Sequence, residues 1–215
     1  MKPKVTTEHH KGQAQIFDNP FLESLTKSNV KSNAVVYGLT VAIVIYVALY
    51  IIDLSFLTFI SLFTFALFSW TFAEYVLHRY LFHWMSENKY AKRFHFIMHG
   101  NHHLYPKDIE RILMPPVPGL IMGSILFGVF YIFFNIIGFP DLTWAFFPGF
   151  FLGYLLYSFF HYATHTVRPP DRFKNIWNHH LLHHYKYPEK AFGVSSTIWD
   201  RVFRTMPPKQ NHKAK

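Results

Sequence analysis

Apolar residues fill two long stretches of the chain that contain no lysine or arginine. One stretch runs between Lys31 and Arg79, and the other between Arg111 and Arg168. Each is too long for one membrane crossing, which needs about 20 residues, and has room for two. The pattern therefore predicts an all-α protein with four transmembrane helices in two hairpins. The expected spans are 33–52, 54–77, 117–137 and 142–160, with tight turns at residue 53 and at residues 138–141, where glycine and proline interrupt the run.

The composition agrees with a membrane protein. The 215 residues are 51% hydrophobic and 20% aromatic, and only 15% are charged, whereas soluble domains carry about 25% charged residues. The absence of cysteine excludes disulfides, thiolate zinc sites and cysteine-bound iron–sulfur clusters. We expect no cleaved signal peptide, because the first apolar run follows a polar, charged segment.

The basic residues indicate how the chain crosses the bilayer. The net charge is +9, which in a soluble protein would suggest nucleic acid as a partner. Here, however, all 21 lysines and arginines lie outside the spans and away from both hairpin tips, in the N-terminal, central and C-terminal segments. By the positive-inside rule these three segments are cytoplasmic. We therefore expect contact with a lipid bilayer and none with nucleic acid.

Two segments flank the spans. Residues 1–32 are expected to form a cytosolic N-terminal segment, in which residues 16–26 alternate phenylalanine and leucine with polar residues. That alternation predicts an amphipathic helix at the membrane interface, although a partly ordered tail remains an alternative. Residues 208–215 are rich in lysine and are expected to be a disordered tail.

Twelve of the 15 histidines fall into four groups beside the spans. The groups are His78 and His83; His95, His99, His102 and His103; His161 and His165; and His179, His180, His183 and His184. The predicted topology places all four groups on one side of the bilayer, where they can meet. Because imidazole is the commonest protein metal ligand, we expect a metal centre in a cytosolic, histidine-rich helical cap.

Helical spacing suggests which histidines share a metal, because residues three or four apart lie on one helix face. His78 and His83 are five apart, so on a regular helix they would point away from each other and bind different metals, unless the helix ends between them. Ten imidazoles exceed the needs of one ion, so we predict two ions. Our working division gives one ion His83, His99, His103, His180 and His184, and the other His78, His102, His161, His165 and His183.

Three polar residues near these groups have two possible roles. His95 and His179 each lie four residues before a predicted ligand, so each could bind metal or donate a hydrogen bond that orients a ligand ring. We favour the second role. Glu74, one turn before His78, could also bond to a ligand histidine, or could be a buried group with another partner. We expect no catalytic residue beyond the metal ligands.

Other candidates lie outside the metal centre. Tyr105, Asp108 and Arg111 follow a histidine group and could contact a lipid head group; the alternative is a surface with an Asp–Arg pair. Three further histidines lie in polar tails and are expected to be exposed to solvent: His9, His10 and His212.

The donor set narrows the choice of metal. Imidazole suits zinc, copper, iron and nickel. A structural zinc needs only four ligands, and a catalytic zinc site would need a carboxylate base, yet the chain has no HExxH motif. Two iron ions fit better, since a di-iron centre can activate O₂ and the membrane supplies lipid C–H bonds.

The histidine segments resemble those of a known family. The chain resembles the membrane fatty acid hydroxylase superfamily, which is sterol desaturase-like, and most closely its fatty acid (sphingolipid) 2-hydroxylases. The matching segments are EYVLHRYLFH (74–83), HFIMHGNHH (95–103), RILMPPVP (111–118), HYATH (161–165), HHLLHH (179–184) and FGVSSTIWDRVF (192–203). The resemblance implies that residues 33–207 form a hydroxylase domain with a non-haem di-metal centre, using O₂ to hydroxylate carbon 2 of a free fatty acid or a ceramide-like lipid. It also implies the ten histidines named above as ligands. Zinc can occupy such sites in a purified protein, but iron is the expected redox metal.

One departure from the family concerns electron supply. Fungal and animal members carry an N-terminal cytochrome b5 domain with an HPGG haem motif, which this sequence lacks. We therefore expect a separate electron donor of the ferredoxin or cytochrome b5 type. The short form resembles bacterial proteins, which implies the cytoplasmic membrane, or the endoplasmic reticulum membrane in a eukaryote.

The sequence also allows other functions. Within the superfamily, the alternatives are a sterol or carotenoid hydroxylase and an acyl desaturase. A membrane metal transporter would place ionisable residues along the middle of its spans, whereas these histidines lie at span ends. A basic membrane scaffold would leave the histidines without a role.

Overall fold

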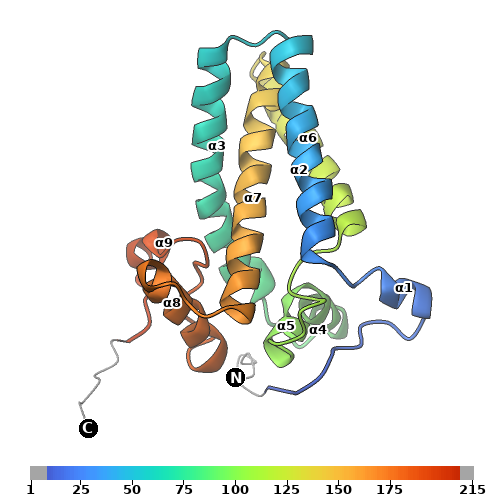
Figure 1. The fold of residues 1–215 in the computed structure, drawn as a ribbon, viewed down its shortest axis with the longest axis vertical. Helices are drawn as coiled ribbons and strands as arrows, with labels where there is room; N and C mark the ends of the chain where they lie inside the picture. The colour runs from blue at the N-terminus through green and yellow to red at the C-terminus, as the bar shows by residue number, and fades with distance from the viewer. Residues whose placement is uncertain (1–8, 209–215) are drawn as a thin grey trace.

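A computed structural model describes residues 9–208 of the chain. Over this range the protein is helical and contains no strands, and four long helices stand side by side at one end of the molecule (Figure 1). They are α2 (Val30–Tyr46), α3 (Phe56–Val76), α6 (Pro116–Ile136) and α7 (Thr143–Thr166). Each is long and apolar enough to cross a membrane. The four predicted spans and their two hairpins are therefore confirmed.

Short extensions lengthen three of these helices. A π-helical turn, η1 (Val47–Ile51), continues α2; another, η2 (Leu77–Phe82), continues α3; and a 3-10 turn, η4 (Pro140–Leu142), leads into α7. The second candidate span therefore reaches Phe82, and the fourth reaches Thr166 because α7 itself runs that far; both ends lie a few residues beyond the predicted ones.

The hairpin tips form where the sequence predicted them. Asp53 has φ 58° and Gly138 has φ 85°, both in the left-handed region. Glycine enters this region without a steric penalty, and aspartate enters it more readily than most residues. These residues reverse the chain between α2 and α3 and after α6.

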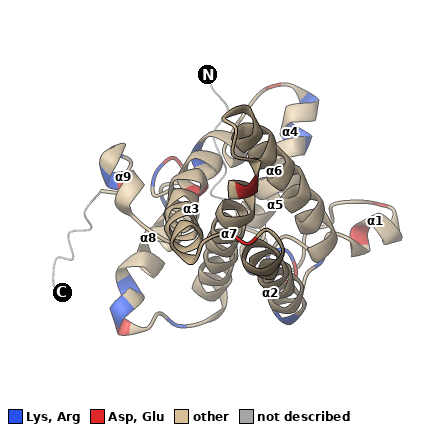
Figure 2. Cartoon of the chain, turned by 90° about the horizontal axis from the view of Figure 1, so that it is seen from above, with Lys and Arg blue, Asp and Glu red and all other residues tan. Residues whose placement is uncertain are grey.

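Helix α7 is the centre of the bundle. Seen from above, it lies among α2, α3 and α6 (Figure 2). In the most apolar 18 residues of this span, 56% are buried. The corresponding share is 17% in each of the other three spans. A β-carbon added at Gly149 would lie 2.2 Å from the Phe63 carbonyl oxygen, and one at Gly153 would lie 2.4 Å from Cβ of Trp70. These glycines thus allow α7 to pack closely against α3.

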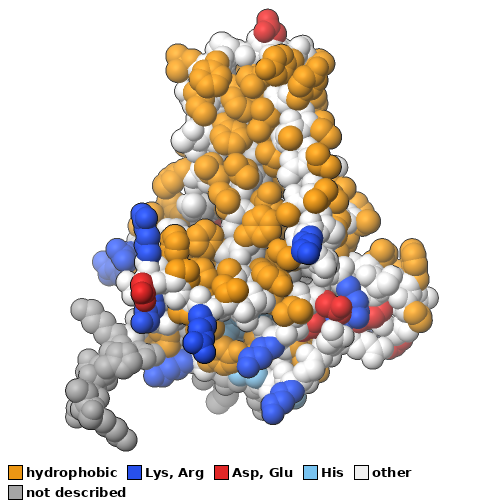
Figure 3. Space-filling view, viewed as in Figure 1, with side chains coloured by type: hydrophobic (Ala, Val, Ile, Leu, Met, Phe, Trp, Pro, Cys, Tyr) orange, Lys and Arg blue, Asp and Glu red, His pale blue; other side chains and the backbone are white. Residues whose placement is uncertain are grey.

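The surface divides into an apolar end and a charged end. Hydrophobic side chains cover the four long helices, whereas lysine and arginine gather around the opposite end (Figure 3). Large side chains on the bundle surface, such as Leu57 (75% exposed) and Ile136 (77%), have no covering within the chain. A water-soluble monomer rarely exposes such a continuous apolar surface. The protein is an integral membrane protein with a polar cap.

The cap consists of short helices below the bundle (Figure 1). They are α4 (Lys89–His95), η3 (Phe96–Gly100), α5 (Asn101–Leu104), η5 (Asp171–Phe173), α8 (Lys174–Tyr185) and α9 (Ile198–Val202). Helix α4 follows η2, and η5 follows α7, through short connections, so the histidines of η2, η3, α5, α7 and α8 converge beneath the spans.

The N-terminal segment differs from the expectation. Residues 16–26 contain only a single helical turn, α1 (Pro20–Ser24), capped by the Asn19 side chain, so the predicted amphipathic helix is wrong. The Glu23 carboxylate accepts hydrogen bonds from the backbone N–H groups of Ile16 and Phe17, at 3.0 and 2.8 Å, and these groups are therefore held outside a helix. The segment is ordered against the cap, as the 2.8 Å bond from Ser28 N–H to the Glu110 carbonyl illustrates. Residues 209–215, most of the predicted disordered tail, and His212 lie outside the described residues.

Candidate metal centre

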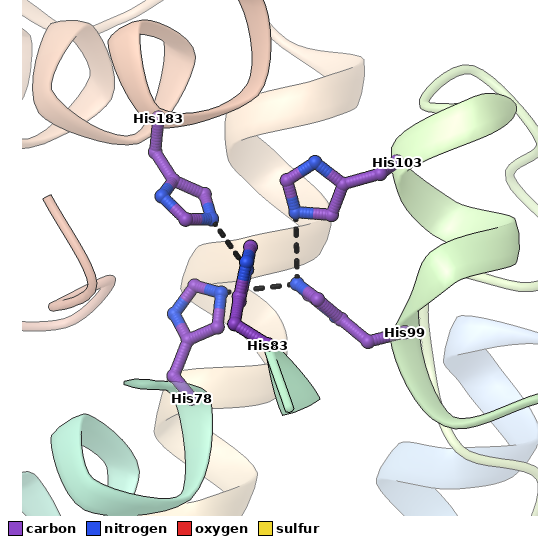
Figure 4. Close-up of side chains that lie close together, drawn as sticks. All are labelled: His78, His83, His99, His103 and His183. Atoms are coloured by element: carbon purple, nitrogen blue, oxygen red, sulfur yellow. Dashed lines mark hydrogen bonds between the residues drawn. The ribbon is translucent and has the colours of Figure 1, made fainter. Parts of the chain in front are cut away.

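The ten predicted ligand histidines meet in the cap as two groups of five. Group 1 is His78, His83, His99, His103 and His183; group 2 is His102, His161, His165, His180 and His184. Within each group, every residue offers one ring nitrogen that lies within 4.8 Å of the others. Figure 4 shows the rings of group 1, which come from η2, η3, α5 and α8 and point toward one another.

The division between the groups corrects the predicted one. His78 and His183 belong with His83, whereas His180 and His184 belong to the other group. The cause for His78 is the backbone: η2 is π-helical, and the N–H of His83 bonds to the carbonyl of His78, five residues back, at 3.2 Å. This winding brings residues five apart onto one face.

The packing of helix α8 explains why its three ligand histidines fall into the opposite groups from those predicted. His180 and His184 are four apart and share a face, as predicted, while His183 projects toward group 1. Spacing correctly paired the first two but could not tell which metal that face would meet, because this depends on how α8 packs on the bundle.

The ring nitrogens have the environment expected of metal ligands. The Nδ1 atoms of His78 and His183 face the carbonyl oxygens of Phe192 and Lys190, the latter at 2.6 Å. Since a carbonyl only accepts, both Nδ1 atoms carry the proton, and each Nε2 presents a lone pair to the centre of group 1.

The distances between ring nitrogens also match those between two ligands of one metal ion. Four pairs of Nε2 atoms lie 3.0 Å apart: His78–His99, His99–His103, His83–His183 and His165–His180. Two nitrogens each about 2.1 Å from one ion lie about 3.0 Å apart when they subtend a right angle. Several buried ring nitrogens, including both of His102 and both of His184, have no hydrogen-bond partner among the described residues. The donors present can therefore hold one metal ion in each group.

Burial keeps these rings neutral. Desolvation, followed by repulsion from neighbouring histidines, lowers the pKa of the cap histidines well below 6.5. The histidines concerned are His83, His99, His102, His103, His180, His183 and His184. Neutral imidazole is the form that binds metal, so the site is suited to coordination at neutral pH.

The three predicted supporting residues bond to groups outside the two sets of ligand rings. His95 lies outside both groups, and its Nδ1 donates to the Phe82 carbonyl at 2.6 Å, at the end of η2. His179 donates to Asp200 at 3.0 Å. Glu74 accepts from the N–H groups of Val194 and Ser195, at 2.6 and 2.9 Å. The expected direct bonds to ligand rings are replaced by bonds to the segments that hold those rings.

A loop that overlaps the family-matching segment 192–203, but to which the sequence analysis assigned no role, provides much of this support. Residues 190–197 supply the two carbonyls that orient His78 and His183. Asp200, fully buried, fixes this loop by accepting from the N–H groups of Phe192 and Gly193, at 3.0 and 2.8 Å. The available signal was Asp200 itself, an acidic residue that follows an uncharged stretch at residues 191–199.

An apolar cavity of roughly 380 Å³ borders both groups, through His99 of group 1 and through His102 and His161 of group 2. Its other walls come from the N-terminal segment, η2, η3, the start of α6 and α7. They include Ile16, Phe17, Leu22, Leu25, Phe82, Ile97, Met98, Met114, Pro118, Tyr154 and Tyr157. The cavity thus joins the two groups by apolar walls.

Two of the predicted head-group residues, Asp108 and Arg111, form a buried ion pair. Arg111 is buried and bonds to Asp108 at 2.8 Å and also to Glu23. Asp108 also accepts from the Ala14 N–H at 3.0 Å. The alternative, an Asp–Arg pair, is therefore correct, although the pair is buried. Arg111 contributes to the cavity wall, but Tyr105 and Asp108 do not.

The histidines of the N-terminal tail are not alike. His10 is exposed, as expected. His9 is half-buried: its Nδ1 donates to the His103 carbonyl at 3.0 Å, and its ring meets the Tyr185 ring edge-on at 4.6 Å. The expectation of a solvent-exposed His9 is wrong, because the N-terminal segment returns to the cap.

These features define a class: a helical membrane protein whose cap gathers ten histidines into two candidate metal sites beside an apolar cavity. Residues 63–205 match the fatty acid hydroxylase family. The chain is 39% identical to mouse fatty acid 2-hydroxylase over 158 residues, which is 72% of this chain and 41% of that protein. It is 38% identical to the ceramide very long chain fatty acid hydroxylase SCS7 of Saccharomyces cerevisiae over 200 residues, 91% of this chain and 50% of the relative.

A solved structure agrees with the sequence matches. The hydroxylase domain visible in full-length scs7p has a TM-score of 0.82 and 35% identity, covering 92% of this chain and 74% of that one. The chain belongs to the fatty acid hydroxylase family. It spans between 41% and 59% of the length of the curated relatives it matches.

Proposed function

We propose that this protein is a membrane-bound monooxygenase that adds a hydroxyl group at carbon 2 of a fatty acyl chain, either free or in a ceramide-like lipid. One observation carries the proposal: a single apolar cavity is bordered by histidines of both candidate metal sites. The relatives named above are fatty acid 2-hydroxylases and ceramide fatty acid hydroxylases, which supports this reaction.

The cofactors we propose are two iron ions, with O₂ as co-substrate. Five nitrogens in each group exceed the four that a structural zinc uses, and imidazole suits iron. Iron bound there would supply the redox chemistry that activates O₂ toward a C–H bond. In balance, one O₂, two electrons and two protons convert the C–H bond to C–OH and release one water.

The chain itself holds and shields the reacting atoms. The ten histidines would bind the metals, and the loop of residues 190–197 orients two of them. The apolar walls of the cavity exclude water and align the acyl chain. Because His161 ends a membrane span and the tyrosines of the cavity lie deeper on the same helix, the first carbons of the lipid would sit beside the histidines. This favours attack near the head group.

Electron supply and topology follow from the charged end of the protein. A ferredoxin- or cytochrome b5-type protein would deliver the two electrons. By the positive-inside rule the basic cap faces the cytosol, in a bacterial cytoplasmic membrane or, for a eukaryotic chain, in the endoplasmic reticulum. An acidic donor would then approach a surface of opposite charge, which favours rapid encounter.

Lipid analysis tests this function. Cells that express the protein should accumulate 2-hydroxy acyl lipids, measured by mass spectrometry, and His103→Ala and His184→Ala variants should not. Metal analysis of the purified protein should give two ions per chain, and a loss in each variant. A new double bond or a ring hydroxyl in place of the 2-hydroxyl would overturn the proposal, as would normal product from either variant.

A further inference from the structure

A second apolar cavity lies farther from the histidines than the first, and it opens on the bundle surface, where Leu120 is 37% exposed. Its volume is roughly 270 Å³. It is lined by Thr40 and Val44 of α2, by Leu120, Gly123, Ser124 and Phe127 of α6, and by Trp144, Phe147 and Phe151 of α7. We call it the deep cavity, and the one beside the histidines the metal-side cavity. The proposed reaction uses only the metal-side cavity.

The two cavities follow one another along the same helices. On α7, the metal-side cavity takes His161 and Tyr154, and the deep cavity begins at Phe151. On α6, the first ends at Pro118 and the second begins at Leu120. On each helix these positions follow one another from the cap toward the far side of the membrane. The deep cavity therefore lies in line with the metal-side cavity.

One side chain stands between them. The Tyr37 ring is fully buried and meets the ring of Tyr154, which lines the metal-side cavity, and that of Phe151, which lines the deep cavity; the centroids are 5.9 and 5.5 Å away. Its other neighbour is Gly119, where an added β-carbon would lie only 1.8 Å from the Tyr37 hydroxyl oxygen.

The hydroxyl group of Tyr37 fixes this position. It bonds to the carbonyls of Met114 and Pro115, at 3.0 and 2.9 Å, and both residues line the metal-side cavity. The Met114 carbonyl has no helical donor, because Pro118 has no N–H, whereas the Pro115 carbonyl also accepts from the N–H of Gly119 at 3.0 Å. The ring therefore spans the gap from α2 to both α6 and α7, at the boundary between the cavities.

We propose that Tyr37 determines which acyl-chain lengths the enzyme accepts, by closing the metal-side cavity against the deep cavity. The occupant of the deep cavity, once the ring is removed, is the tail of the acyl substrate. This inference rests on the proposed function, since it requires an acyl chain with its first carbons beside the histidines.

Helix geometry sets the scale of the effect. At 1.5 Å per residue, Tyr154 lies about 10 Å from His161 along α7, and Trp144 about 25 Å. An extended chain advances about 1.2 Å per bond, so a straight tail reaches the boundary after roughly nine carbons and the end of the deep cavity after roughly twenty. With Tyr37 present, longer tails must turn within the metal-side cavity or leave it.

The test combines a product measurement with a binding measurement. The full-length protein, in lipid nanodiscs, receives a mixture of saturated acyl substrates that differ in length. The Tyr37→Ala variant should raise the ratio of long to short 2-hydroxy products by about tenfold, the scale on which pockets discriminate between chains of different length. Separately, a fatty acid with a diazirine at its terminal carbons is photo-crosslinked and the labelled residues are mapped. In the natural protein the label should fall near Tyr154; in the variant it should move to Gly123, Phe127 and Phe147.

Matched variants separate the partition from general damage. Tyr37→Phe keeps the ring and should keep the natural length profile. Tyr46→Ala removes an exposed tyrosine from the same helix and should also leave the profile unchanged. In Tyr37→Ala/Thr40→Phe the new ring lies three residues along the same helix face, and the length profile should return toward the natural one.

Each outcome decides the proposal. Labelling that stays near Tyr154 in Tyr37→Ala overturns it, and so does labelling of the deep cavity in the natural protein. If Tyr37→Ala does not fold, Tyr37→Leu, which keeps apolar bulk but lacks the reach to Gly119, takes its place in both measurements. Absence of 2-hydroxy product from every protein would refute the proposed function, while the crosslinks would still decide the role of Tyr37.

Discussion

The backbone N–H of Val194 donates to the carboxylate of Glu74 across 2.6 Å, joining the last turns of α3 to the loop that supports the histidines. The same carboxylate accepts from the N–H and the hydroxyl of Ser195. A carboxylate buried at the end of a membrane span is costly unless its hydrogen bonds are satisfied. Here the bonds to the loop satisfy it, and in return the loop is fixed against the helix that carries His78.

The first prediction concerns this link. Glu74→Ala leaves two buried N–H groups without an acceptor, which destabilises the fold by about 2 kcal/mol or more. The loosened loop should also orient His78 and His183 less well, so the metal content should fall. Thermal unfolding in detergent and metal analysis measure both effects.

Glu74→Gln is the matched control. Its amide oxygen can still accept from both N–H groups, and its NH₂ can donate to the Ser195 hydroxyl. It should therefore retain most of the stability and the metal. Full metal content with unchanged unfolding in Glu74→Ala would contradict the supporting role of this residue.

The second prediction concerns pH. Burial lowers the pKa of the cap histidines well below 6.5, so they stay neutral in the folded protein while the unfolded chain takes up protons near 6.5. The unfolded state then binds more protons, and stability is complete above pH 6.5 and is lost as the pH falls below it. Each such histidine contributes a slope of about 1.4 kcal/mol per pH unit in that window.

Unfolding of metal-stripped protein as a function of pH measures this slope without competition from metal. His99→Gln should reduce the slope by about one proton's share, because the amide does not titrate. With metal present, acidification below pH 6.5 should also release the ions, since protons compete for the same nitrogens. An acid-insensitive protein, or an unchanged slope in the variant, would count against neutral, buried rings.

Several features of the fold and the site were predictable from the sequence for physical reasons. A membrane span must be long and apolar. The two stretches without a basic residue, from Lys31 to Arg79 and from Arg111 to Arg168, therefore predicted two helices each. Helical spacing brought His161 and His165 together, and the shared topology brought all ten histidines to one end.

Other features depend on information that the sequence pattern does not contain. The pairing of His78 with His83 depends on a π-helical turn, whereas spacing rules assume a regular helix. The face of α8 that meets each group depends on tertiary packing. The metal-side cavity draws residues from many segments between Ile16 and His161, so no local pattern reveals it.

The third prediction concerns the buried cluster of Arg111, Asp108 and Glu23. The side chains of Arg111 and Asp108 are 3% and 2% exposed, and together they hold the N-terminal segment over the metal-side cavity. Arg111→Met leaves a buried carboxylate without its partner, which typically costs about 3–5 kcal/mol. Residues 14–26 should then detach, seen as faster amide exchange at Ala14, Ile16 and Phe17 and as new protease cleavage.

Lys27→Ala is the control for this variant. The Lys27–Glu110 pair also lies between the N-terminal segment and the cap, but each side chain is 40% exposed. Exposed pairs contribute about 0–1 kcal/mol, so the segment should stay in place. If Arg111 instead bound a lipid head group, Arg111→Met would raise KM with no change in amide exchange.

The fourth prediction concerns the packing of α3 against α7. Gly149 and Gly153 are four residues apart on one face of α7, and a β-carbon at either would overlap Phe63 or Trp70 of α3. In membranes, helices associate through such close contacts between small residues.

Because backbone atoms of α3 stand in the way at Gly149, Gly149→Ala must push the helices apart, at a cost of about 1–3 kcal/mol. The same displacement would shift His161, on the last turns of α7, relative to His78 on η2, which continues α3, so thermal unfolding should occur earlier and metal retention should fall. Gly128→Ala, on α6 with nothing within 4 Å of the new methyl group, should leave both measurements unchanged or slightly improved. Equal behaviour of the two variants would show that close packing at Gly149 does not position the histidines.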